Sequence, residues 1–261
     1  MTIAIERDPD AAHVAHCWLD FGQLNLLSPD AVAELGERVR SVSSEVSVLT
    51  IEGTPDEEGK IGGLTGGLKL DVVSEFSATE ARDLIDSLHD AIEAVRSVEA
   101  VTVCGCGEYA LGAGLELAMA CDFRVATEGA TLGLPEIDVG LVTGIHGGLL
   151  VRLVGLGRAK ELIYLGEPVS GTHAAEIGLV NRAVPAAEYD ATVEEVTTRL
   201  AAKSPPILRR QKEVFRAWRS MGVERGIDSS RTDIAACFDT DDQLEAMRAF
   251  LEKRDPEFAD R

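Results

Sequence analysis

Short runs of β-branched and apolar residues recur through the first half of the chain. They cover residues 2–5, 14–19, 45–53, 100–107 and 123–127. Runs of this length and composition are typical of β-strands, and the acidic turn residues between the first two runs favour a hairpin. These five segments predict the strands of a sheet.

Segments with helical spacing lie between the predicted strands. Ser28 followed by Pro29 predicts the start of a helix, because serine caps a first turn and proline is tolerated within it. Ser77 and Glu80 form a capping box ahead of a stripe of apolar residues at helical spacing. Strands that alternate with helices favour a mixed α/β core.

The second half of the chain, from about Gly144, has a predominantly helical pattern. One last strand is predicted at "LVNRAVP" (179–185). We predict a catalytic core over residues 1–190 and a C-terminal helical region over residues 191–261. The helices predicted in this half cover 145–154, 158–165, 171–177, 186–203, 205–220, 223–237 and 240–253.

Composition and net charge exclude some classes of binding partner. The 261 residues include 45 acids and 25 bases, and the net charge of −20 repels nucleic acid phosphates and anionic membranes. The sequence has neither an apolar stretch of membrane-spanning length nor a signal-peptide pattern, so we expect a cytoplasmic protein. Acids scattered over the chain suit concentrated salt and predict a halophilic source, with an ordinary acidic cytosolic protein as the alternative.

The five cysteines give no sign of a metal site. Cys104 and Cys106 lie two residues apart in an apolar run, and the set lacks the paired spacing of a zinc site. We expect reduced, mostly buried thiols and no bound metal.

The segment "ALGAGLELAMACD" (110–122) combines small residues with an isolated carboxylate. Gly112, Ala113 and Gly114 allow a ligand to approach the backbone, and the helix predicted to follow directs free amides toward it. Such amides stabilise a developing oxyanion. Glu116 lies within this apolar helix, where a carboxylate is costly unless it has a partner or a function.

A second carboxylate, Glu136, lies among the apolar residues of "LGLPEIDVG" (132–140). Two such glutamates are candidates for a pair whose surroundings separate their pKa values, so that one acts as base and the other as acid. The spacing alone does not exclude the alternative, in which each glutamate is a solvated or salt-bridged side chain without a catalytic role. A further glycine-rich stretch, "GGLTGGLKLDVV" (62–73), offers a second set of backbone amides.

Four consecutive blocks of the sequence resemble the crotonase (enoyl-CoA hydratase/isomerase) family in order, spacing and residue type. The resemblance implies a crotonase-like α/β core of ββα type with a helical C-terminal region. It also implies an enzyme of fatty acid β-oxidation that adds water to a trans-2-enoyl-CoA, with no cofactor because CoA is part of the substrate. The blocks are "ALGAGLELAMACDFRVA", "LGLPEIDVGL", "GRAKELIYLGEPVSGTHAAEIGLVNRAVP" and "FDTDDQLEAMRAFLEKRDPEF".

The resemblance implies roles for particular residues. Glu116 and Glu136 match the two glutamates that hold the water in the family's hydratases. The amides of Ala113 and Gly66 match its oxyanion hole, with Thr65 as the alternative to Gly66. Because the C-terminal contacts to CoA often come from a neighbouring subunit in the family, we expect a homotrimer or a hexamer. The residues that match contacts to CoA or the acyl group are Gly67, Leu68, Lys69, Phe250 and Lys253.

The chain departs from the family pattern at several positions. Ala113 stands where glycine is usual, and Lys69 where an acid is common. Leu149 and Leu150 lie near the place of a frequent Thr-Gln-Arg sequence. His146, close to that place, either faces the acyl pocket or is a structural histidine. These departures bear on acyl-chain preference more than on the fold.

Three alternatives to hydration stay open. Residues 105–110 satisfy the dinucleotide-binding pattern Gly-x-Gly-x-x-Ala, but no helical period begins directly after them. Isomerases, decarboxylases and thioester hydrolases belong to the same family, and an isomerase can work with the glutamate at position 136 alone, so the presence of Glu116 favours hydration. The third alternative is a non-catalytic CoA-binding protein, against which two intact glutamates argue.

Overall fold

The computed structural model describes residues 2–55 and 61–258. In this part of the chain, a seven-stranded sheet has the order β1-β2-β3-β4-β5-β6, with β7 also beside β5. Strands β2 to β5 are parallel, as are β5 and β7, whereas the β1/β2 and β5/β6 pairs are antiparallel. The strands are β1 (Thr2–Arg7), β2 (Val14–Asp20), β3 (Val48–Gly53), β4 (Val101–Leu111), β5 (Phe123–Gly133), β6 (Val169–Ser170) and β7 (Arg182–Val184).

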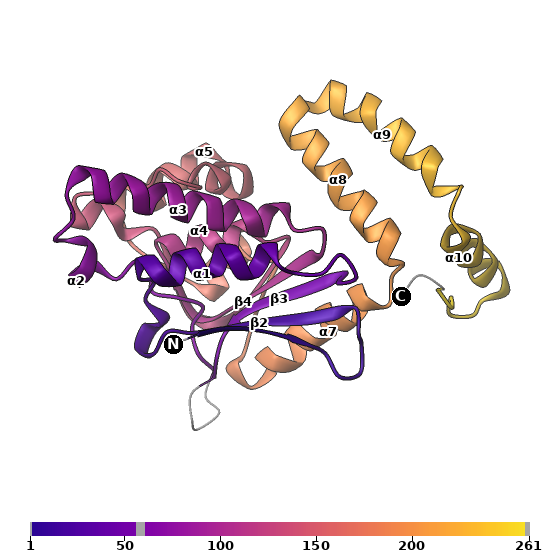
Figure 1. The fold of residues 1–261 in the computed structure, drawn as a ribbon, viewed down its shortest axis with the longest axis horizontal. Helices are drawn as coiled ribbons and strands as arrows, with labels where there is room; N and C mark the ends of the chain where they lie inside the picture. The colour runs from indigo at the N-terminus through magenta and orange to yellow at the C-terminus, as the bar shows by residue number, and fades with distance from the viewer. Residues whose placement is uncertain (1, 56–60, 259–261) are drawn as a thin grey trace.

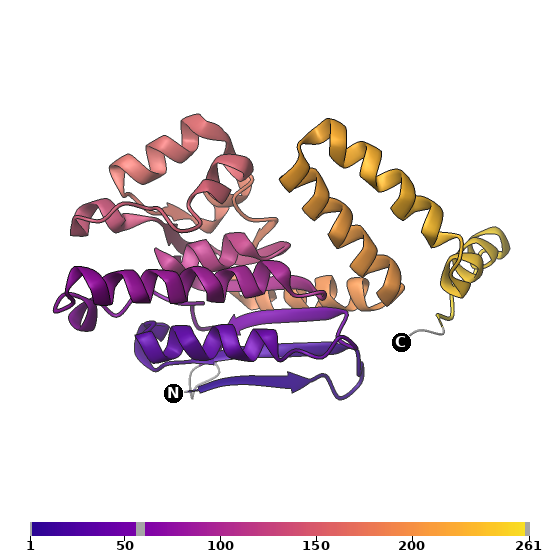
Figure 2. The same cartoon turned by 45° about the horizontal axis from the view of Figure 1, so that its top comes forward.

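Helices cover the two faces of the sheet and continue beyond it (Figures 1 and 2). They are α1 (Pro29–Arg40), α2 (Leu70–Val73), α3 (Ala78–Ser97), α4 (Ala113–Ala120), α5 (Gly148–Leu165), α6 (Gly171–Glu176), α7 (Tyr189–Ala201), α8 (Pro205–Met221), α9 (Val223–Cys237) and α10 (Asp241–Glu252). Short 3-10 turns are η1 (Gln23–Asn25), η2 (Pro135–Val139) and η3 (Ala186–Glu188). The predicted mixed α/β core with helices at the C-terminus is confirmed.

Strand side chains alternate between two apolar cores. Cys104 and Cys106 belong to the large core that the sheet forms with α1, α3 and α4, whereas Val103 belongs to the smaller core under α7. Successive side chains of a strand point to opposite faces, so a strand covered on both faces reads as one apolar run. All five cysteines are free and four are buried, as predicted. Within the described ranges, no three metal-ligating side chains are arranged to hold an ion.

Several predicted elements end at other residues than expected. Strands β4 and β5 both extend past their predicted ends, because Tyr109 to Leu111 pair with Thr131 to Gly133. The helices predicted over 145–154 and 158–165 are joined in α5, which begins three residues later than expected. Gly155, with a φ of 78°, marks the interruption between them. Strand pairing therefore explains the longer β4 and β5, and the conformation of Gly155 explains the break within α5.

Helices α8, α9 and α10 form an arm that extends away from the sheet (Figures 1 and 2). The Nζ atom of Lys212 ties α8 to the core through the Ala100 carbonyl oxygen at 2.6 Å and the Asp122 carboxylate at 2.8 Å. Helix α7, which lies across the predicted boundary at residue 190, packs on the sheet; that boundary stays a prediction. No helix in the part of the chain described is long and apolar enough to cross a membrane.

Candidate active site

Helix α4 begins just after β4 and places Glu116 in the protein interior. All eight residues of α4 are buried, and Glu116 is 3% exposed. Its Oε1 accepts a hydrogen bond from the backbone N–H of His146 at 2.8 Å. Burial raises the pKa of Glu116 to about 7; amides of residues 145–147 oppose this shift, and the charge of Glu136 adds to it. Glu116 can therefore gain or lose a proton near neutral pH.

Glu136 reaches the same place from turn η2. Its Oε2 accepts a hydrogen bond from the hydroxyl of Thr143 at 2.8 Å. A Cβ atom added to Gly112 would lie 3.2 Å from Oε1 of Glu136, which places this carboxylate beside the start of α4, and the φ of 54° at Gly112 favours glycine. Gly112 precedes Glu116 by four residues, about one helical turn. The structure thus brings together the two glutamates that the sequence singled out.

The first turn of α4 provides a free backbone amide beside the carboxylates. Ala113 is the first residue of the helix and is 6% exposed. Amides of a first turn have no acceptor within their own helix, and that of Ala113 has no other partner among the residues described. The positive end of the helix dipole also favours negative charge at this point. The Ala113 amide can therefore bind an oxyanion, as its predicted role requires.

The glycine-rich loop over residues 61–69 lies against this helix start. A Cβ atom added to Gly67 would lie 2.9 Å from the carbonyl oxygen of Leu111 and 3.6 Å from the amide nitrogen of Ala113, and the φ of 95° at Gly67 also favours glycine. A Cβ atom added to Gly114 would lie only 2.4 Å from the carbonyl oxygen of Thr65. Glycines on both sides therefore permit the loop backbone to contact α4.

Hydrogen bonds within this loop decide which of its amides are available. The Gly66 amide donates to the carbonyl oxygen of Leu24 at 2.8 Å, and the Gly67 amide donates to the hydroxyl of Thr65 at 3.0 Å. The Leu68 amide has no partner within residues 2–55 and 61–258. Because an N–H group makes one strong hydrogen bond, the bond to Leu24 conflicts with the predicted oxyanion role of Gly66. Leu68 is the better candidate.

The residues predicted to contact CoA do not all lie together. Leu68 and Lys69 belong to the glycine-rich loop, where Lys69 Nζ is 4.0 Å from the Asp71 carboxylate. Phe250 is 82% exposed on α10, and Lys253 caps that helix with a φ of 56°. Figure 1 shows α10 at the end of the arm, well separated from α4. A single chain thus leaves Phe250 and Lys253 apart from the two glutamates.

His146 directs its side chain toward α3 rather than toward the carboxylates. The ring is buried and stacks on His89, with the ring centres 5.0 Å apart. Its Nε2 lies 3.5 Å from Oε2 of Glu93. Of the two interpretations that the sequence left open, the structure supports the structural one, although the backbone of the same residue holds Glu116.

Sequence reasoning missed two further residues. The hydroxyl of Thr143, which holds Glu136, lies in a loop without a periodic pattern. Glu52 is 8% exposed at the end of β3, and burial raises its pKa to about 7. A charged residue in the apolar run of a predicted strand was the available signal for Glu52.

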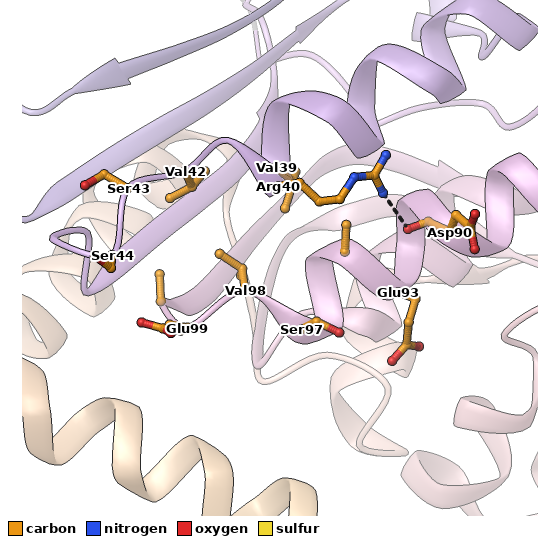
Figure 3. A pocket seen from close by; sticks show the side chains of 12 residues that line it. Val39, Arg40, Val42, Ser43, Ser44, Asp90, Glu93, Ser97, Val98 and Glu99 are labelled. Atoms are coloured by element: carbon orange, nitrogen blue, oxygen red, sulfur yellow. Dashed lines mark hydrogen bonds between the residues drawn. The ribbon is translucent and has the colours of Figure 1, made fainter.

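The cavity in Figure 3 is separate from the candidate site. It has a volume of about 450 Å³ and lies where α1 and α3 end, with Arg40, Asp90 and Glu93 among its lining residues. Arg40 donates to the Asp90 carbonyl oxygen at 3.4 Å (dashed line in Figure 3). Its lining includes neither Glu116 nor Glu136.

Comparison with known proteins relates this arrangement to a described family. The profile of the family "Enoyl-CoA hydratase/isomerase" matches residues 14–261. The chain is 32% identical over 238 residues to a crotonyl-CoA hydratase of Syntrophomonas wolfei, covering 90% of each chain. It is 28% identical over 232 residues to a short-chain-enoyl-CoA hydratase of Clostridium acetobutylicum, covering 88% of each. The crystal structure of an enoyl-CoA hydratase from Bacillus anthracis superimposes with a TM-score of 0.90, at 29% identity over 100% of both chains.

Proposed function

The chain belongs to the enoyl-CoA hydratase/isomerase family, and we propose that it adds water across the 2,3 double bond of a trans-2-enoyl-CoA to give a 3-hydroxyacyl-CoA. One observation carries this proposal: Glu116 and Glu136 meet at the start of α4, beside the unpaired amide of Ala113. Adding water requires one group that accepts a proton and one that donates it. Two carboxylates at an oxyanion-binding amide suit that requirement, whereas isomerisation needs only one proton carrier.

In the proposed reaction, backbone amides polarise the thioester. The carbonyl oxygen accepts hydrogen bonds from the amides of Ala113 and Leu68, with Leu68 in place of Gly66 because the Gly66 amide already bonds to Leu24. These donors stabilise the negative charge that develops on the oxygen as C3 is attacked. A single preorganised donor of this kind typically contributes about 3–4 kcal/mol.

The attacking water lies between the two carboxylates in this proposal. The pair reacts in the state in which its one proton is on Glu136. Glu116 accepts a proton from the water as the water oxygen bonds to C3, and Glu136 delivers a proton to C2. The two glutamates return to their starting states by passing one proton between them, so the net change is the addition of one water. A pKa near 7 allows Glu116 to take part at neutral pH. The reaction requires no metal or redox cofactor, because CoA is part of the substrate.

We propose that the arm mediates assembly into a homotrimer or a hexamer. Large apolar side chains are exposed along α8, α9 and α10, and burial against further copies removes this surface from water. Assembly also allows Phe250 and Lys253 of one subunit to contact CoA bound by another. Light scattering tests this, and a monomer in solution contradicts it. Exposed apolar residues of the arm include Phe215, Trp218, Ile234, Phe238, Phe250 and Leu251.

The first experiment follows the loss of enoyl-thioester absorbance when purified protein is mixed with crotonyl-CoA. A fast loss that disappears in Glu136→Gln is the expected result. No loss, with CoA still bound, would redirect the proposal to isomerisation, decarboxylation or thioester hydrolysis. The assay is run in high and low salt, and higher activity in concentrated salt is the result expected of a halophilic protein.

A further inference from the structure

The loop between η2 and α5, residues 140–147, contacts both glutamates. The hydroxyl of Thr143 donates to Glu136, and the backbone N–H of His146 donates to Glu116, each at 2.8 Å. Half of the residues in this loop are exposed, and the side chain of Val142 is 84% exposed. An exposed loop needs a contact with the core to keep both hydrogen bonds in place. This matters for the reaction, because small displacements of catalytic groups lower the rate strongly.

The ring of His146 makes such a contact, beside the half-buried side chain of Ile145, which packs on the main core. It is 5% exposed and stacks on His89 at an interplanar angle of 14°. His89 and Glu93, which both face the ring, are four residues apart on α3 and so lie on one face of that helix. Stacking on His89 holds the ring, and the 3.5 Å separation of its Nε2 from Oε2 of Glu93 is at most a weak hydrogen bond. Burial lowers the pKa of His146, which keeps the ring neutral at neutral pH.

Helix α3 gives the ring a rigid surface. Its 20 residues begin with a capping box formed by Ser77 and Glu80, and Leu84, Leu88 and Ile92 bury its inner face. A capping box fixes the residue at which a helix starts, and a buried apolar face fixes how the helix is oriented on the core. A loop that packs on α3 is therefore held in a defined position relative to the sheet.

We propose that His146 is a positioning residue: its side chain packs loop 140–147 against α3 and thereby holds the Thr143 hydroxyl and the His146 amide on the two catalytic carboxylates. The ring points away from Glu116 and touches neither carboxylate. This inference rests on the proposed hydration insofar as it treats Glu116 and Glu136 as catalytic. The contacts of the loop itself do not depend on the reaction.

A displaced loop changes the titration of Glu116 in a defined direction. Amides of residues 145–147 lower the pKa of Glu116, while burial and the charge of Glu136 raise it. Loss of these amides while Glu116 stays buried therefore raises the pKa of Glu116. If Glu116 acts as its anion, the acid limb of the activity profile moves to higher pH. The charged and titratable groups around the His146 ring itself are His89, Glu93 and Arg96.

The test measures kcat, KM and the pH profile with crotonyl-CoA for His146→Ala and His146→Phe. His146→Ala keeps the backbone amide, so its effect must come through the position of the loop. We expect kcat to fall roughly 10- to 100-fold, KM to change less than about threefold, and the acid limb to move upward. His146→Phe, which retains a ring to stack on His89, is expected to lose less. His173→Ala is the control, since His173 forms a comparable contact with Glu176, at 3.0 Å, on the surface.

A second readout is independent of activity. Carbon-13 NMR of labelled glutamate carboxyls follows the titration of Glu116, whose signal is identified by its loss in Glu116→Gln. The midpoint is expected to rise in His146→Ala. An unchanged midpoint in folded His146→Ala overturns the inference even if the wild type does not hydrate crotonyl-CoA. A His146→Phe variant as impaired as His146→Ala would contradict the packing role. If His146→Ala does not fold, His146→Gln, which has no ring, replaces it with the same criteria.

Discussion

Glu116 and Glu52 are both buried glutamates, and burial raises the pKa of each to about 7. They lie in different regions, Glu116 in helix α4 and Glu52 at the end of β3. Oε2 of Glu52 accepts a hydrogen bond from the hydroxyl of Tyr189 at 3.4 Å, and this hydroxyl in turn accepts one from the Gly107 amide at 3.1 Å. Glu116 faces a second carboxylate and lies one turn from the amide of Ala113, which has no hydrogen-bond partner among residues 2–55 and 61–258.

This difference shows that a raised pKa does not by itself identify a catalytic carboxylate. Around Glu52, the hydrogen bonds join β3, β4 and α7 to one another, and Glu52 also lines a cavity with His16 and Asp190. Around Glu116, the amide of Ala113 and the carboxylate of Glu136 are available to a ligand. A polar group without a partner gains most from a bound substrate, because an unsatisfied buried group is costly.

The largest effect is expected from neutralising the paired carboxylates. Glu116→Gln and Glu136→Gln should each lower kcat by about 10²–10⁴-fold, the usual contribution of a positioned acid or base. Circular dichroism establishes that each variant is folded. Near-normal kcat in both would remove the functional distinction between Glu116 and Glu52.

Removal of the Ala113 amide should have the next largest effect. Proline lacks the N–H group but fits the first position of a helix, so Ala113→Pro deletes the donor with little cost to α4. We expect kcat to fall roughly 10²–10³-fold. Ala78→Pro, at the first position of α3, is the matched control. Equal turnover in the two variants would show that the unpaired amide does not distinguish the region around Glu116.

The elements and the two glutamates could be predicted because their signals are local. Ser28 and Ser77 cap the predicted helices, and Glu116 and Glu136 were visible as carboxylates within apolar sequence. The order of the family blocks then placed these glutamates in one site. Hydrophobic periodicity and helix capping depend only on residues close together in the sequence, so both signals can be recognised from the sequence alone.

The remaining features depend on contacts between segments far apart in the sequence. The Gly66 amide is occupied because the loop packs on Leu24, and no pattern within the loop shows this. The ring of His146 is buried by α3, and Glu52 is paired by a tyrosine that lies 137 residues further along the chain. Such contacts decide which polar groups are satisfied, and therefore which remain for a substrate.

A smaller effect is expected from the hydroxyl that holds Glu136. Thr143→Val keeps the shape of the side chain and removes its hydrogen bond. Because one such bond contributes about 0.5–1.5 kcal/mol, kcat should fall by no more than about tenfold. Thr172→Val, which removes an exposed hydroxyl on α6, is the control. A loss as large as that of Glu136→Gln would mean that Thr143 does more than orient the carboxylate.

The smallest effect on turnover is expected at Glu52. Glu52→Gln should leave kcat within about twofold, but it should change the stability of the fold with pH. A pKa of about 7 in the native state against 4.5 in the unfolded chain means that the native state retains a proton that the unfolded chain has released. Stability therefore falls as pH rises from 4.5 to about 7.

Glutamine does not ionise, so the free energy of unfolding of Glu52→Gln should not fall with rising pH in this way. Urea unfolding at pH 8 should show Glu52→Gln to be more stable than the wild type, by up to about 3 kcal/mol at 1.36 kcal/mol per pKa unit. Below pH 4.5 the two proteins should be alike, because Glu52 is protonated in both states. Glu116→Gln should show the same gain in stability with a large loss of turnover. If Glu52→Gln also lost turnover a hundredfold, both buried glutamates would belong to the reaction, and the contrast between the two regions would fail.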